Sequence, residues 1–84
     1  MMNQDFTKSV GEMASYLKEN NVQRVTAREV FVSRPGFTLP DNFKEQAHGE
    51  AGRLLGGRAV SAAQTQALIR AAADQLALEQ SSPS

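Results

Sequence analysis

His48 is the single histidine of the chain, and it begins the tripeptide His48-Gly49-Glu50. A His-x-Glu spacing occurs in zinc deaminases, where the histidine binds zinc and the glutamate transfers protons, but cysteines complete that metal site. The chain contains no cysteine. The sequence therefore predicts a polar role for His48 on a helix beside Glu45, with no metal and no other cofactor.

The inventory of other groups that could catalyse a reaction is small. Without cysteine there is no thiol nucleophile, no thiolate metal site and no disulfide framework. The nine carboxylates are scattered, and no two of them stand at helical spacing in an apolar setting that would separate an acid from a base. We expect that the protein is not an enzyme.

Four glycines near two arginines invite comparison with a phosphate-binding loop. Backbone amides without side chains can cradle a phosphate, and an arginine can neutralise it. The Gly-Lys-Ser/Thr sequence of the P-loop is absent, however. A helix kink at Gly49 and Gly52 and a helix end at Gly56 and Gly57 account for all four residues.

Charge is balanced over the whole chain but not along it. Nine basic side chains match nine acidic ones, which predicts no strong attraction to nucleic acid or to anionic lipid. The section 24–58 has six cations and four carboxylates, and five of the six cations are arginine. Arginine suits both phosphates and protein interfaces. We therefore predict a binding face that includes Arg28, Arg34, Lys44, Arg53 and Arg58.

These residues need helices to position them, and the first helix is predicted for residues 4–19. Its apolar residues recur at steps of three and four and form one stripe, which comprises Phe6, Val10, Met13, Ala14 and Leu17. Asn20 and Asn21 should end this helix, because asparagine tolerates the left-handed conformation. Methionine and tyrosine are good interface residues, so Met13 and Tyr16 join the predicted binding residues.

A second, short helix is predicted for residues 26–33. Thr26 and Glu29 have the spacing of a capping box, and Val25 and Val30 have that of a hydrophobic staple. Pro35 should end the helix. The alternative for 25–39 is a hairpin in which the β-prone residues 30–32 turn back at 34–36 and pair with 37–39.

Two further helices complete the expected fold. The third covers residues 41–55, with Asp41 as N-cap, a bend near Gly49 and an end at Gly56-Gly57. The fourth covers 62–80, after a second capping box formed by Ser61 and Gln64. The predicted class is all-α or mainly α: one small domain, 1–80, built as a bundle of about four helical segments, followed by a disordered tail at 81–84. The central pair of helices could form a helix-turn-helix.

These patterns favour a small non-enzymatic module that binds another protein through its helix surfaces, as an adaptor, an inhibitor or a regulatory subunit. The alternative is a small helix-turn-helix-like DNA-binding regulator that uses the basic section 24–58. We expect a protein partner in preference to DNA, and homodimerisation stays open. No signal peptide and no apolar run long enough to cross a membrane is visible, so we expect a cytoplasmic protein without membrane contact.

Overall fold

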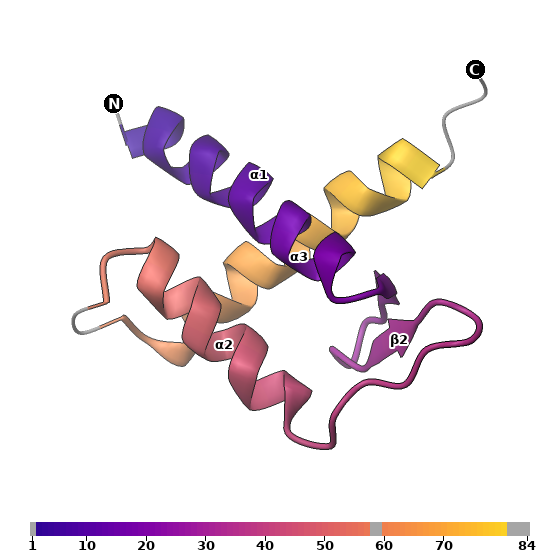
Figure 1. Cartoon of the computed structure of the whole chain (residues 1–84). Coiled ribbons are helices and arrows are strands. Elements are labelled where there is room, and N and C mark those ends of the chain that lie inside the picture. The colour runs from indigo at the N-terminus through magenta and orange to yellow at the C-terminus, as the bar shows by residue number, and fades with distance from the viewer. Residues whose placement is uncertain (1, 58–59, 81–84) are drawn as a thin grey trace.

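The computed structural model describes residues 2–57 and 60–80, which form three helices and a two-stranded antiparallel sheet (Figure 1). In chain order the elements are α1 (Met2–Glu19), β1 (Val22–Val25), β2 (Phe31–Ser33), α2 (Phe43–Leu54) and α3 (Ala62–Gln80). The predicted all-α or mainly α bundle of about four helical segments is therefore wrong, because the chain combines three helices with a sheet. The predicted tail at 81–84 and the predicted binding residue Arg58 lie outside the described residues.

Two asparagines end α1. Asn21 has φ of 66°, the left-handed conformation that closes a helix, and the Asn20 side-chain amide donates to the carbonyl oxygen of Tyr16 at 2.8 Å. The predicted end of the first helix at Asn20-Asn21 is confirmed. The reversal of direction at Asn21 sends the chain directly into β1.

The predicted helix at 26–33 is replaced by the turn of a hairpin and its second strand. β1 and β2 pair so that Val25 lies opposite Phe31 and Arg24 opposite Val32, with an irregularity at Gln23. The hairpin alternative for 25–39 is also wrong about the partner, because β2 pairs with the preceding segment and not with 37–39. Two segments that contain β-branched residues thus pair as antiparallel strands across a short turn.

The apparent capping box serves this turn instead. The Glu29 amide donates to the Thr26 carbonyl oxygen at 2.8 Å, and the Thr26 amide donates to the Val30 carbonyl oxygen at 3.1 Å. The Thr26 hydroxyl accepts from the amide of Val30 at 3.2 Å, and Glu29 has φ of 60°. A type I turn followed by a left-handed residue is a common three-residue hairpin loop.

With no helix at 26–33, the predicted helix-turn-helix scaffold is absent from the described residues. A turn does form at Arg34-Pro35-Gly36, where the Phe37 amide donates to the Arg34 carbonyl oxygen at 3.1 Å and Gly36 has φ of 90°. Proline followed by a glycine of positive φ is typical of a type II turn. The chain beyond this turn reaches α2 without forming a strand.

The later helix boundaries are closer to expectation. Ser61 and Gln64 form the predicted capping box, with the Gln64 amide 3.2 Å from the Ser61 hydroxyl and the Ser61 amide 2.9 Å from the Gln64 side-chain oxygen. Gly56 and Gly57 both have positive φ and end α2 as predicted. Asn42 and not Asp41 is the N-cap residue of α2, and the helix continues through Gly49 without a break.

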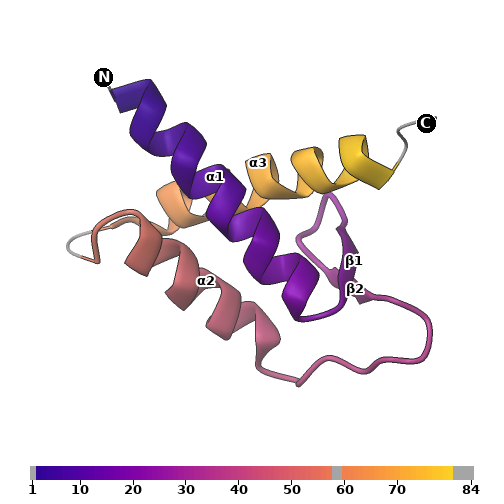
Figure 2. The same cartoon turned by 45° about the horizontal axis from the view of Figure 1, so that its top comes forward.

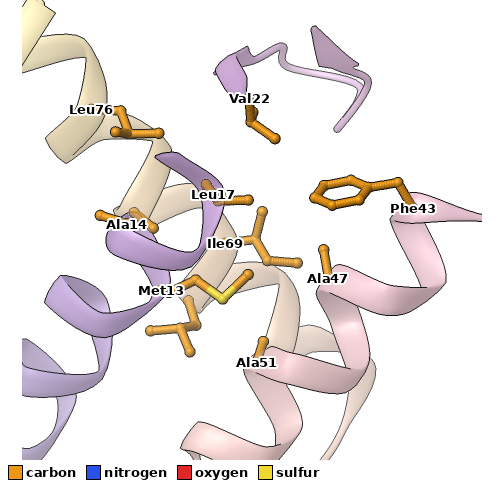
Figure 3. Close-up of a cluster of buried hydrophobic side chains, with 11 residues drawn as sticks. Met13, Ala14, Leu17, Val22, Phe43, Ala47, Ala51, Ile69 and Leu76 are labelled. Atoms are coloured by element: carbon orange, nitrogen blue, oxygen red, sulfur yellow. The ribbon is translucent and has the colours of Figure 1, made fainter. Parts of the chain in front are cut away.

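The core lies where the three helices meet the hairpin (Figures 1 and 2). α1 crosses α3, α2 packs against both helices, and β1 packs against α1 and α3. Figure 3 shows the buried side chains, with Met13 of α1 pointing toward the short side chains of Ala47 and Ala51 on α2. The fully buried larger side chains are Met13, Leu17, Val22, Leu68, Ile69 and Leu76.

Candidate functional site: a polar cluster and the hairpin groove

Three polar side chains from three separate elements meet behind the hairpin turn, and we call Glu29, His48 and Thr65 the polar cluster. Nδ1 of His48 lies 2.8 Å from the Thr65 hydroxyl oxygen, and Nε2 lies 3.6 Å from Oε1 of Glu29. The Thr65 residue is 6% exposed, and the side chains of Glu29 and His48 are 10% and 25% exposed. The cluster therefore ties the turn to α2 and α3 in a poorly hydrated setting.

The hydrogen bonds indicate which ring nitrogen carries a hydrogen. The Thr65 hydroxyl donates to the carbonyl oxygen of Ala62 at 2.9 Å, so its oxygen is left to accept from Nδ1–H of His48. Among the described residues, Nε2 is buried without a hydrogen-bond partner and faces the carboxylate of Glu29. The separation of Nε2 from Oε1 of Glu29 is within ion-pair range but too long for a hydrogen bond.

An acid, a histidine and a hydroxyl are also the parts of a nucleophilic triad, but their geometry here serves structure. The Thr65 hydroxyl is buried and its hydrogen is used by Ala62, so a substrate does not reach a free nucleophile. No group of three or more metal-ligating side chains occurs in residues 2–57 and 60–80. We assign the polar cluster to positioning of the hairpin turn.

Sequence reasoning missed both partners of His48. The His-x-Glu spacing pointed to Glu50, but Glu50 accepts two hydrogen bonds from Arg53, with Nε at 3.1 Å. This bonding from Arg53 lowers the pKa of Glu50. Thr65 lies 17 positions from His48, and Glu29 lies in the segment predicted to be a helix. No local pattern signals contacts between elements so far apart.

On the outer side of the same turn lies a concavity that we call the hairpin groove. It has a volume of about 270 Å³ and lies between the turn and the beginning of α2. Its apolar lining includes Val30, Phe31, Leu39, Pro40 and Phe43, and its charged lining includes Arg28, Glu29, Asp41 and Lys44. The structure thus brings together Arg28 and Lys44, two of the binding residues predicted from the sequence.

Only some of the charged side chains of the hairpin groove are exposed and free of ion pairs. Arg28, Asp41 and Lys44 are exposed, and no ion pair involves them within the described part of the chain. Glu29 instead is turned inward to His48. The rim therefore offers two free cations and one free carboxylate. Val30 is 55% exposed, so an unusually accessible apolar side chain lies beside these cations.

Below the groove, aromatic rings hold its floor in place. Phe31 and Phe43 meet edge to face with ring centroids 5.2 Å apart, and Tyr16 stacks on Phe43 at 6.0 Å. Arg70 of α3 donates to the Thr26 carbonyl oxygen at 3.3 Å and so contacts the turn from behind. The groove is consequently built on contacts to all three helices.

The other predicted binding residues do not join Arg28 and Lys44. Met13 is fully buried in the core and has no surface for a partner. Tyr16 borders a separate shallow depression along α1, where burial and then nearby Glu50 raise the pKa of its phenol. Arg34 is exposed on the turn after β2, outside the groove lining, and Arg53 is paired with Glu50.

Comparison of the chain with protein-family models, with curated proteins and with solved structures finds no match in any of the three. Within residues 2–57 and 60–80, no helix is long and apolar enough to cross a membrane. Function must therefore be argued from the polar cluster and the hairpin groove themselves.

Proposed function

We propose that this chain is a small non-enzymatic protein-binding module that holds an acidic, apolar segment of another protein in the hairpin groove. The observation that carries the proposal is the gathering of two unpaired cations, Arg28 and Lys44, around an apolar floor that contains exposed Val30. Interfaces commonly combine a buried apolar centre with a polar, solvent-accessible rim. The free cations favour a segment with carboxylates at its rim.

The size of the groove supports a peptide segment in preference to a duplex. A volume of about 270 Å³ accommodates a few side chains, whereas a DNA duplex needs an element that fits a groove and a broad basic surface. The predicted helix-turn-helix that would supply such an element is absent from the described residues. Phosphate contact by the exposed arginines is therefore the second outcome that the experiment tests.

Other expectations from the sequence stay predictions. They are the absence of catalysis, a cytoplasmic location and the option of homodimerisation. An adaptor, an inhibitor and a regulatory subunit would all bind a segment of another protein, and the proposal covers this shared property.

Charge reversal at the groove rim should abolish most of the binding. The probe is the blocked pentapeptide acetyl-Val-Glu-Val-Asp-Val-amide, which combines carboxylates with β-branched side chains. Arg28→Glu/Lys44→Glu should raise its Kd about tenfold or more, since two attractive contacts become repulsive. Isothermal titration or amide chemical shifts of the full chain measure the effect.

A matched control makes the same change of charge elsewhere on the surface. Lys8→Glu/Arg24→Glu alters two exposed cations outside the groove lining, and it should leave the Kd within about twofold. Equal weakening by both double variants, or no binding by the parent chain, contradicts the proposal. Steep salt-dependent binding of mixed-sequence duplex DNA that both variants weaken would instead support the DNA alternative.

A further inference from the structure

The strand β2 is an open edge of the sheet. The sheet has two strands, so β2 has a backbone partner, β1, along one edge only. Side chains of β2 contact other segments, with the Phe31 ring against Phe43 of α2 and the Ser33 hydroxyl donating to the Phe37 carbonyl oxygen at 2.8 Å. The connection that follows β2 bends away from it before returning to α2 (Figure 1). An unpaired strand edge is a template for another extended chain.

The hydrogen-bond register identifies the backbone groups on this edge. The Thr26 amide donates to the Val30 carbonyl oxygen, so these two residues form a hydrogen-bonded pair at the end of the hairpin. Residues opposite each other alternate between hydrogen-bonded and non-hydrogen-bonded pairs in an antiparallel ladder. The next pair, Val25 and Phe31, is therefore non-hydrogen-bonded. Consequently the N–H and C=O of Phe31 point away from β1, toward the open edge.

Phe31 also lines the hairpin groove, so the open edge adjoins the groove at this residue. We propose that the bound segment adds to β2 as a third strand, exchanging two backbone hydrogen bonds with Phe31 while its apolar side chains enter the groove. This inference rests on the proposed function and specifies the partner as an extended acidic segment. Strand addition gives affinity through the backbone and specificity through alternate side chains.

Charge favours such a segment over a second copy of the chain. The residues of β2 are Phe31, Val32 and Ser33, which carry no charge, and Arg34 follows them. Two copies paired through β2 would bring Arg28 and Arg34 of each copy to the same edge, without carboxylates from the strands to balance them. A segment that carries carboxylates balances the cations at the rim.

The experiment compares singly N-methylated versions of acetyl-Val-Glu-Val-Asp-Val-amide in binding to the full chain. In a strand pair only every second residue uses its N–H toward the partner. Methylation of the one residue that donates to the Phe31 carbonyl oxygen should therefore raise the Kd about tenfold, and methylation of either neighbouring residue should leave it within about twofold. Binding of the parent peptide should also slow hydrogen exchange at the Phe31 amide, with the Val30 amide, already bonded to Thr26, as internal reference.

The results separate this inference from the proposed function. If every methylated peptide binds like the parent, or all are weakened equally, strand addition is contradicted, while loss of binding in Arg28→Glu/Lys44→Glu still supports the groove. If the Phe31 amide becomes protected with rising protein concentration and no peptide, the edge belongs to a second copy and the inference fails. If the parent peptide does not bind at all, both proposals fail.

Discussion

Met13→Ala is expected to lower the free energy of unfolding by about 2–5 kcal/mol, the range measured for large-to-small changes in packed cores. The Met13 side chain is fully buried and points toward Ala47 and Ala51 (Figure 3). These two alanines leave space on α2 that a long, flexible thioether can fill. Truncation empties this space, and the short side chains opposite cannot close it.

A matched control lies on the exposed face of the same helix. Ser15→Ala removes one polar atom from an exposed position of α1 and should change the free energy of unfolding by about 0.5 kcal/mol or less. Denaturant melts with a common m-value measure both variants. If Met13→Ala unfolds at the same denaturant concentration as the parent but binds the probe peptide more weakly, Met13 is a surface binding residue and its burial in the core is contradicted.

The sequence around Met13 is compatible with two roles, burial in the core and exposure at a binding surface. Its place in the stripe with Val10 and Leu17 predicts burial, whereas its residue type suggests an interface. The structure follows the stripe, because periodicity reports which face of a helix meets its neighbours. Residue type alone reports only what a side chain could do if it were exposed. Where the two disagree, helical position decides.

Two capping boxes of equal local quality have different outcomes, and their surroundings explain why. Ser61 and Gln64 precede an alanine-rich segment with high helix propensity, and the box forms as predicted. Thr26 and Glu29 lie between β-branched residues that can pair as strands, and the same spacing becomes a hairpin turn. Tertiary pairing therefore overrides a local signal where the flanking residues do not support it.

The sequence predicted some residues of the candidate site but not the contacts between them. Composition placed Arg28 and Lys44 in the basic section of the chain, but their approach depends on a turn that the sequence analysis assigned to a helix. The polar cluster depends on it still more, since Glu29 reaches His48 only when the hairpin folds back over α2. Contacts of this kind follow from topology, and no spacing along one element predicts them.

The polar cluster yields the second large effect, which is expected for His48→Ala. This change removes the imidazole that contacts the Glu29 carboxylate and the Thr65 hydroxyl, so both polar groups lose a partner in a poorly hydrated setting. Leaving a buried polar group without its partner costs about 1–3 kcal/mol, and we expect a loss of that size. The exposed neighbour Glu45 supplies the control, since Glu45→Ala should cost about 0.5 kcal/mol or less.

A double-mutant cycle with Glu29→Ala tests whether the two side chains act as a pair. The coupling energy from denaturant melts should be about 1–3 kcal/mol, as found for residues in direct contact. A third variant, Glu29→Gly, distinguishes loss of the carboxylate from strain in the turn. Residue 29 has φ of 60°, and glycine adopts this conformation without the cost of roughly 1–2 kcal/mol that other residues have. Glu29→Gly should therefore destabilise less than Glu29→Ala while still losing the coupling to His48. Additive effects, or a cost of His48→Ala no greater than that of Glu45→Ala, would contradict the assignment of the polar cluster to positioning of the hairpin turn.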